Sequence, residues 1–149
     1  MLRTPPAADR HSFAVNLQLS HGRPGAHARL ELHDRPGGRI ALVQLGGWLD
    51  ALAVTRLERA VDELALRGIE QLLIDCADLR HIDYRAVPEL ARALSRFECR
   101  AGGVVMCGLS HYLRDLFRLA GCESGLRCWP SAAELLDLPA LEAARERAS

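Results

Sequence analysis

The chain has few aromatic residues, no excess of either charge and no long apolar run. Of its 149 residues, 5% are Phe, Trp or Tyr, and 19 basic and 19 acidic side chains give a formal net charge of zero. A nucleic-acid-binding domain usually carries a basic excess on one face, so nucleic acid is not expected as a partner. A membrane-spanning helix needs roughly 18 consecutive apolar residues, and because no stretch approaches that length we expect no membrane insertion.

Signals for secretion, disulfide bonds, metals and catalysis are also missing. Residues 1–11 lack the apolar segment of a secretory signal, which predicts a cytoplasmic protein. Reduced thiols are expected there, and no CxxC pair or zinc-like spacing occurs, so we predict neither metal nor cofactor. The chain has no glycine-rich phosphate loop and no Gly-x-Ser-x-Gly motif, and therefore no enzyme activity is predicted. The five cysteines are Cys76, Cys99, Cys107, Cys122 and Cys128.

The order of apolar patterns predicts one α/β domain over residues 28–141. Residues 1–27 are expected to form a flexible extension, in which the alternating stretch 12–20 is either an extra edge strand or a tail. Residues 142–149 are charged and predict a frayed end. The apolar fraction of 49% is sufficient for a single core.

Within this domain the apolar period changes between two and 3.6, as in alternating strands and helices. Segments 28–34 and 39–45 predict a hairpin across a Pro-Gly turn, and further short strands are expected at 71–75, 103–107 and 126–129. We therefore predict a mixed, mostly parallel sheet of about four to five strands covered by about four helices. Apolar helix stripes are predicted at Leu57/Ala60/Val61/Leu64, Leu90/Leu94/Phe97 and Leu113/Leu116/Phe117/Ala120.

Several polar residues occupy positions typical of helix N-caps. Asp50 precedes the first predicted helix and Ser110 the third, where a side-chain oxygen accepts a hydrogen bond from a free backbone amide. Ser131 and Glu134 have the spacing of a capping box and predict a fourth helix running toward residue 141. The two histidines His81 and His111 are predicted to be solvated loop residues.

Several short motifs, in order over about residues 28–138, resemble the STAS family. They are Gly47-Trp48-Leu49-Asp50, Leu73-Ile74-Asp75, Leu79, Ile82-Asp83, Gly103-Val104-Val105, Gly108-Leu109 and Leu119-Ala120-Gly121. In the anti-sigma factor antagonists of this family, the loop after the Ile-Asp pair carries a phosphorylatable Ser or Thr. A partner kinase with a histidine-kinase-like ATP fold modifies that residue, and the added charge of about −1.5 to −2 breaks the complex.

This sequence departs from the family at that loop. The family's Asp-Ser-Ser-Gly becomes Asp83-Tyr84-Arg85-Ala86, so the acceptor position holds Arg85, which cannot take a phosphoryl group. The usual switch is therefore expected to be absent. The resemblance predicts that Asp83, Tyr84, Arg85, Ala86, Val87 and Glu89 form the partner-binding edge, with Ser110 as a minor candidate for a regulatory hydroxyl.

Pro88 is the second departure. Proline lacks an amide hydrogen and clashes with the preceding helical turn, so it is tolerated best near N1. We therefore expect the second helix to start late, with Pro88 in its first turn and a longer, stiffer segment at Asp83–Val87.

The resemblance implies a non-catalytic protein-binding module, an anti-sigma factor antagonist-like regulator that lacks the usual serine. Its expected partner is an anti-sigma factor or another ATP-fold kinase. One alternative is a STAS subunit bound to the ATPase of an ABC-type lipid transporter. A second alternative is a small-ligand sensor.

Overall fold

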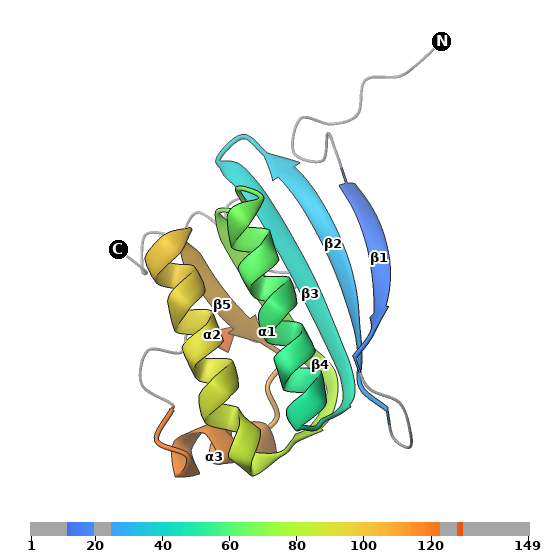
Figure 1. Ribbon diagram of the computed structural model, residues 1–149, viewed down its shortest axis with the longest axis vertical. Helices are drawn as coiled ribbons and strands as arrows, with labels where there is room; N and C mark the ends of the chain where they lie inside the picture. Colours follow the sequence, from blue (N-terminus) through green and yellow to red (C-terminus); the bar gives the residue numbers. More distant parts are fainter. Residues whose placement is uncertain (1–11, 20–24, 123–127, 130–149) are drawn as a thin grey trace.

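The computed structural model describes residues 12–19, 25–122 and 128–129 (Figure 1). These residues form an α/β domain in which helices lie against a curved sheet. The strands are β1 (Ser12–Gln18), β2 (His27–Arg35), β3 (Gly38–Leu49), β4 (Gln71–Ile82), β5 (Gly103–Cys107) and β6 (Cys128–Trp129). The helices are α1 (Ala51–Leu66), the 3₁₀ turn η2 (Tyr84–Ala86), α2 (Val87–Arg100) and α3 (His111–Leu119).

The sheet has six strands in the order β1-β2-β3-β4-β5-β6. The pairings β1–β2 and β2–β3 are antiparallel, while β3–β4, β4–β5 and β5–β6 are parallel. The predicted α/β class and mixed sheet are therefore confirmed. The strands β2 to β6 agree with the four to five strands predicted for residues 28–141, and Ser12–Gln18 adds β1 at the edge of the sheet beside β2. The helix expected at 131–141, with Ser131 and Glu134, lies outside the described residues.

Strands β3 and β4 are much longer than their apolar runs predicted. Each spans 12 residues, whereas the sequence indicated 39–45 and 71–75. Their parallel pairing continues beyond Asp75 through register shifts between Gln44 and Gly46 and between Gly47 and Trp48. These irregularities break the period of two, so the continuation of the strands is not visible in the apolar pattern.

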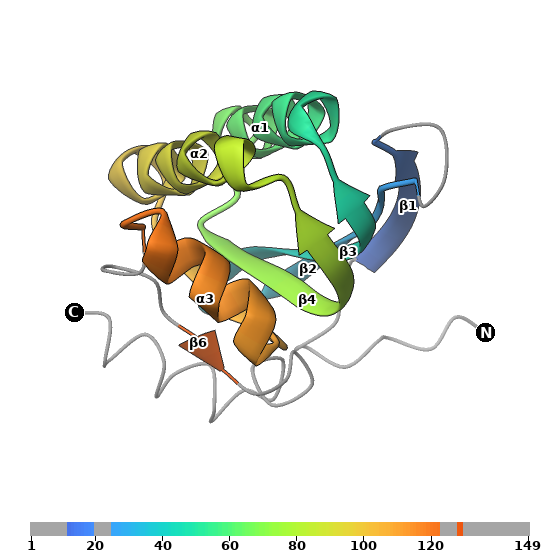
Figure 2. The same ribbon diagram turned by 90° about the horizontal axis from the view of Figure 1, so that it is seen from below.

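Helices α1 and α2 lie side by side on one face of the sheet, and α3 lies near the end at which α2 begins (Figures 1 and 2). The predicted apolar stripes are the buried ones, apart from Ala60 and Ala120, which are partly exposed. Buried helix residues are Ala53, Val54, Leu57, Val61 and Leu64 in α1, Val87, Leu90, Ala93, Leu94 and Phe97 in α2, and Leu113, Leu116 and Phe117 in α3.

A charged cluster joins the exposed sides of α1 and α2. Arg96 Nη2 of α2 lies 3.2 Å from Asp62 Oδ2 and 3.6 Å from Glu58 Oε1 of α1. The hydrogen bond to Asp62 raises the pKa of Arg96 above its usual value. Because the cluster is solvent-exposed, its contribution to stability is small, and the apolar contacts beneath it hold the helices together.

The central strands are buried on both faces, as is usual for a parallel sheet. Leu72, Ile74 and Cys76 of β4 face the core shared with the helices. Leu73 of β4 and Val105 of β5 alternate with those positions and are equally buried on the other face. This two-sided burial explains why the sequence reads 71–75 and 103–107 as continuous apolar runs.

Candidate partner-binding site

The turn after β4 is held in place at both ends. The Asp83 amide donates to Leu49 O at 2.7 Å, and Asp83 Oδ1 accepts from the Arg85 amide at 3.0 Å. The Ala86 amide donates to Asp83 O at 2.8 Å, which closes the 3₁₀ turn. Ala86 and Val87 are buried. Asp83 therefore caps the turn by accepting a backbone amide.

Helix α2 begins at Val87, with Pro88 in its first turn. The expected late start of this helix is therefore confirmed. The segment before it is a 3₁₀ turn that leads directly into α2. The backbone between β4 and α2 is therefore held in one conformation by the turn. A fixed backbone lowers the conformational entropy that the side chains of the turn would lose on binding.

Arg85 projects from this turn into solvent. Its side chain is 90% exposed, and its Nε lies 3.8 Å from Asp83 Oδ1. An exposed pair at that separation contributes little and is easily exchanged. The guanidinium is therefore available to a partner. Ala86 and Val87 were also predicted to contact a partner, but they face the core. Their packing fixes the position of the turn, and any effect on binding would be indirect.

Tyr84 links the turn to α3. Its hydroxyl donates to Leu119 O at 3.0 Å, while about half of its side chain remains exposed. The free carbonyl groups at a helix C-terminus need such hydrogen-bond donors. This contact between residues 35 positions apart was not predicted from the sequence.

Removing that hydroxyl should loosen the link between the turn and α3. Tyr84→Phe is expected to lower the free energy of unfolding by about 0.5–1 kcal/mol, because one partly exposed hydrogen bond is lost. Urea unfolding measures the change, and hydrogen–deuterium exchange should become faster at the amides of residues 120–122. An unchanged unfolding midpoint with unchanged exchange would show that the contact adds no stability.

A row of three rings lies beside the turn and corrects one prediction. The Trp48 ring centroid is 5.1 Å from that of His81, and the His81 ring stacks on Tyr112 at 5.6 Å. The Tyr112 hydroxyl and His81 Nδ1 are 2.5 Å apart. The prediction that His81 is a solvated loop residue is wrong, because β4 extends through Ile82. Trp48 of β3 thus contacts the neighbouring strand β4.

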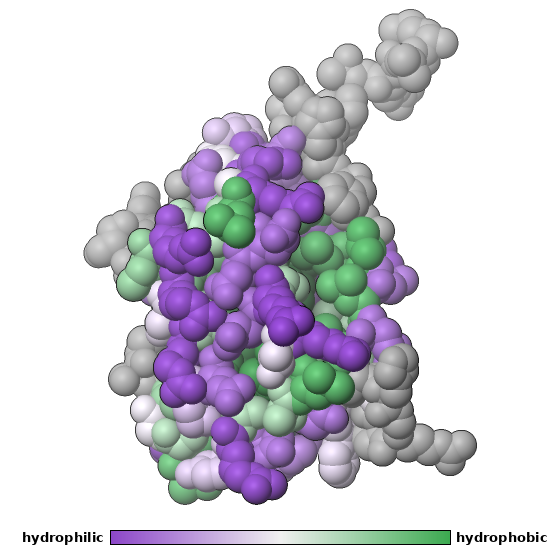
Figure 3. All heavy atoms as spheres, in the orientation of Figure 1, coloured by the Kyte–Doolittle hydropathy of each residue, from purple (hydrophilic) through white to green (hydrophobic). Residues whose placement is uncertain are grey.

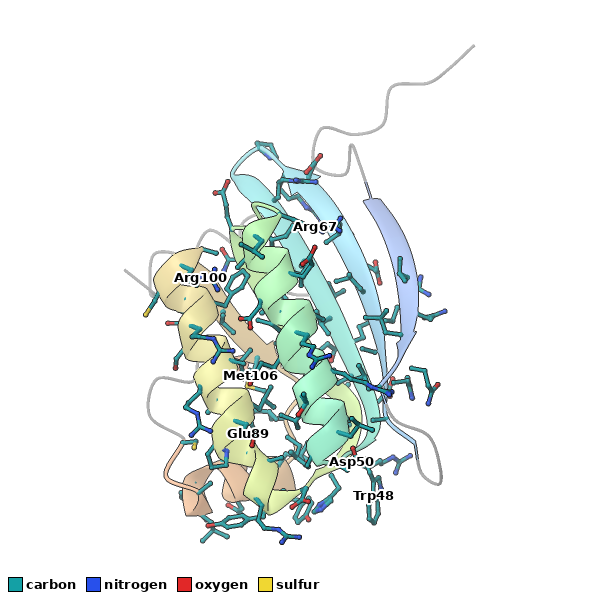
Figure 4. The ribbon with its side chains drawn as sticks, in the orientation of Figure 1. Trp48, Asp50, Arg67, Glu89, Arg100 and Met106 are labelled. Carbon is teal, nitrogen blue, oxygen red and sulfur yellow. The ribbon has the colours of Figure 1, made fainter. Side chains whose placement is uncertain are left out.

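The remaining predicted residues surround the same end of the molecule. Asp50 Oδ1 accepts from the Ala53 amide at 2.8 Å and Ser110 Oγ from the Leu113 amide at 3.1 Å, so both N-cap predictions are confirmed. Figure 4 shows Trp48 and Asp50 where β3 runs into α1, and Glu89 in the first turn of α2. His111 is exposed, as predicted, but it is the first residue of α3 and does not lie in a loop.

These features define a small α/β domain with an exposed, rigidly held turn at the carboxyl end of its parallel strands. A model of the STAS domain family matches residues 33–135. The chain therefore belongs to the STAS domain family, and the resemblance found from the sequence motifs is confirmed. No curated protein sequence matches this chain. Among its described residues, no helix is long and apolar enough to cross a membrane.

Solved structures with the same fold include two anti-sigma factor antagonists. Unphosphorylated SpoIIAA aligns with a TM-score of 0.56 at 20% identity, over 66% of this chain and 85% of that chain. The antagonist from Mycobacterium paratuberculosis gives 0.57 at 18% identity, over 78% and 92%. The murine anion transporter Slc26a9 gives 0.57 at 14% identity, over 72% of this chain and 18% of the transporter. At these sequence identities, the matches show that the fold is shared and nothing more specific.

Proposed function

We propose that this STAS domain is a non-catalytic, cytoplasmic regulator that binds an anti-sigma factor or a related ATP-fold kinase through the η2 turn. The observation that carries the proposal is the exposed Arg85 on a turn fixed by Asp83 and Tyr84. Arginine and tyrosine are among the residues most often found at binding hot spots. A fixed backbone reduces the entropy lost when these side chains meet a partner.

The residue at the acceptor position also determines how such a complex would be regulated. A phosphoserine there would add negative charge and separate the proteins by repulsion and desolvation. Arg85 carries a permanent positive charge and no hydroxyl. Binding would therefore be constitutive, and its extent would follow the abundance of the protein or of a competing STAS protein.

Charge reversal at Arg85 tests this proposal. In a pull-down from native cytosol read by mass spectrometry, wild type should retain an ATP-fold kinase, and Arg85→Glu should weaken binding by roughly tenfold or more, as at a hot-spot residue. Arg100→Glu is the matched control, since Arg100 is exposed at the far end of α2 (Figure 4). Equal recovery of the kinase with both variants would place the binding surface elsewhere.

A transporter subunit is the second candidate function. It is favoured by the occurrence of this fold within the murine anion transporter Slc26a9. If the pull-down retains a transporter ATPase that Arg85→Glu releases, the turn is the binding site but the pathway differs. Nothing in residues 12–19, 25–122 and 128–129 favours the small-ligand alternative.

A further inference from the structure

The sheet is wider than the layer of helices that covers it. Helices α1 and α2 lie over β3 to β5, and among the described residues no helix lies over the same face of β1 and β2 (Figure 1). Neighbouring strands are about 4.8 Å apart, so two uncovered strands offer a width of about 10 Å. One helix with its side chains has a diameter of roughly 10–12 Å. The helix layer therefore has room for one further helix beside α1.

The uncovered part of this face is apolar. Val15 of β1 lies opposite Leu30 of β2, and Leu30 lies opposite Val43 of β3, which belongs to the core. Directly opposite side chains share a face, and their exposure increases from 4% at Val43 to 40% at Val15. Figure 3 shows apolar atoms gathered beside α1 on this side of the molecule. We call the open residues of this face the apolar strip: Val15, Leu17, Leu30 and Leu32.

The other face of the same two strands is polar. Asn16 of β1 lies opposite Arg29 of β2, and Arg29 Nε lies 3.5 Å from Glu31 Oε2. An antiparallel sheet with one polar and one apolar face usually buries the apolar face. Contiguous apolar residues that stay open on a protein surface mark interaction sites more often than single exposed residues do. The apolar strip thus has the composition of a buried face, although it is open.

The flank of α1 that borders the apolar strip carries positive charge. Arg56 Nη1 donates to Leu19 O, just after β1, at 3.0 Å, so this flank faces β1. Arg59 lies three residues further on, hence on the same side of the helix, and it is exposed. The acid further along, Glu63, is paired with Arg67 at 2.9 Å. A ligand in the apolar strip would therefore meet a basic wall.

We infer that the apolar strip is a docking surface for an amphipathic helix of a partner protein, whose acidic residues face Arg56 and Arg59. Such a helix lies beside α1 and completes the helix layer over β1 and β2. A second copy of this chain is a poorer occupant, because a two-fold contact would bring the arginines of both copies together. A flat membrane surface does not reach the apolar strip, because α1 rises above the sheet by about its own diameter of 10 Å.

A pair of synthetic peptides tests this inference on the full chain. One is a fluorescent amphipathic peptide of about 18 residues, roughly 27 Å long as a helix, with leucine at every third or fourth position and glutamate on its flanks. The other has lysine in place of each glutamate. In fluorescence anisotropy titrations, wild type should bind the acidic peptide about tenfold more tightly than the basic one, because only the acidic peptide complements the arginines.

Charge reversal on α1 should reverse this preference. The double variant Arg56→Glu with Arg59→Glu is expected to bind the basic peptide more tightly than the acidic one. The double variant Arg92→Glu with Arg100→Glu is the matched control, because it makes the same change in net charge at exposed positions of α2. That control should keep the preference of wild type. Equal preferences in the two double variants would overturn the inference.

The apolar floor is tested separately. Val15→Asn removes an apolar contact without adding charge and should weaken binding of the acidic peptide by about tenfold. Asn16→Ser, at the next position on the opposite face, should leave binding unchanged, and circular dichroism must show that both variants are folded. Unchanged binding in Val15→Asn, or failure of wild type to bind either peptide, would overturn the inference.

Two further measurements identify the rival occupants. A dimer of wild type in sedimentation that Val15→Asn dissociates would assign the apolar strip to a second copy and overturn the inference. Co-sedimentation with phosphatidylglycerol vesicles that Val15→Asn abolishes would overturn it in favour of a lipid surface. The inference does not rest on the η2 turn, so none of these results decides the Arg85 experiment.

Discussion

Replacing Phe117 with alanine is expected to lower the free energy of unfolding by about 3–5 kcal/mol. Phe117 is fully buried in the core, on the inner face of α3. Truncation removes its apolar surface and leaves a cavity that the strands and helices around it can fill only in part. Because domains of this size are stable by about 5–15 kcal/mol in total, the loss would be a large fraction of the stability.

Denaturant unfolding followed by circular dichroism measures this effect. Leu119→Ala is the matched control, because Leu119 lies two residues further along α3 and is 68% exposed. That variant should change stability by less than about 0.5 kcal/mol, and it keeps the carbonyl that accepts from Tyr84. Similar losses in the two variants would show that α3 is not anchored through Phe117.

Gly102→Ala is expected to cost about 2–3 kcal/mol, through a clash of backbone with the new methyl group. Gly102 has a φ of +157°, and a Cβ atom there would lie 2.1 Å from the carbonyl oxygen of Glu70. That oxygen accepts the Gly103 amide at 3.2 Å where β4 and β5 begin to pair. The strands would have to separate locally to admit the side chain.

Gly68→Ala separates the clash from the effect of backbone conformation. Gly68 has a φ of +84°, and nothing lies within 4 Å of its added Cβ. Its substitution should cost only about 1–2 kcal/mol for the left-handed conformation of a non-glycine residue. Thermal unfolding of both variants measures the comparison. A Gly102→Ala variant as stable as Gly68→Ala would mean that the β4–β5 junction relaxes without loss.

The helices and their caps could be predicted from the sequence because both depend on local spacing. The stripe Leu113, Leu116 and Phe117 has the helical period and is the buried face of α3. Asp50 and Ser110 each accept the amide three residues ahead. Pro88 restricts the backbone by its own ring and so marks the first turn of α2.

The parts that were missed depend on contacts between distant segments. The extension of β4 to Ile82 follows from its pairing with β3 beyond Gly46, which no local period reveals. That extension brings His81 beside Trp48 and Tyr112, and the position of α3 brings Leu119 O to Tyr84. The sequence located the exposed turn through a family motif, while the contacts that hold it required the folded chain.

The sequential order of the sheet has a consequence for how the chain is made. Every strand from β1 to β6 pairs with the next one in the sequence. During synthesis, each new strand therefore finds its pairing partner already made. No strand needs to remain unpaired until a distant segment of the chain has been synthesised. The antiparallel strands β1 to β3 need only local closure, which is fast. Each parallel strand follows a helix, so β4, β5 and β6 can pair only after a longer segment of chain has closed on itself.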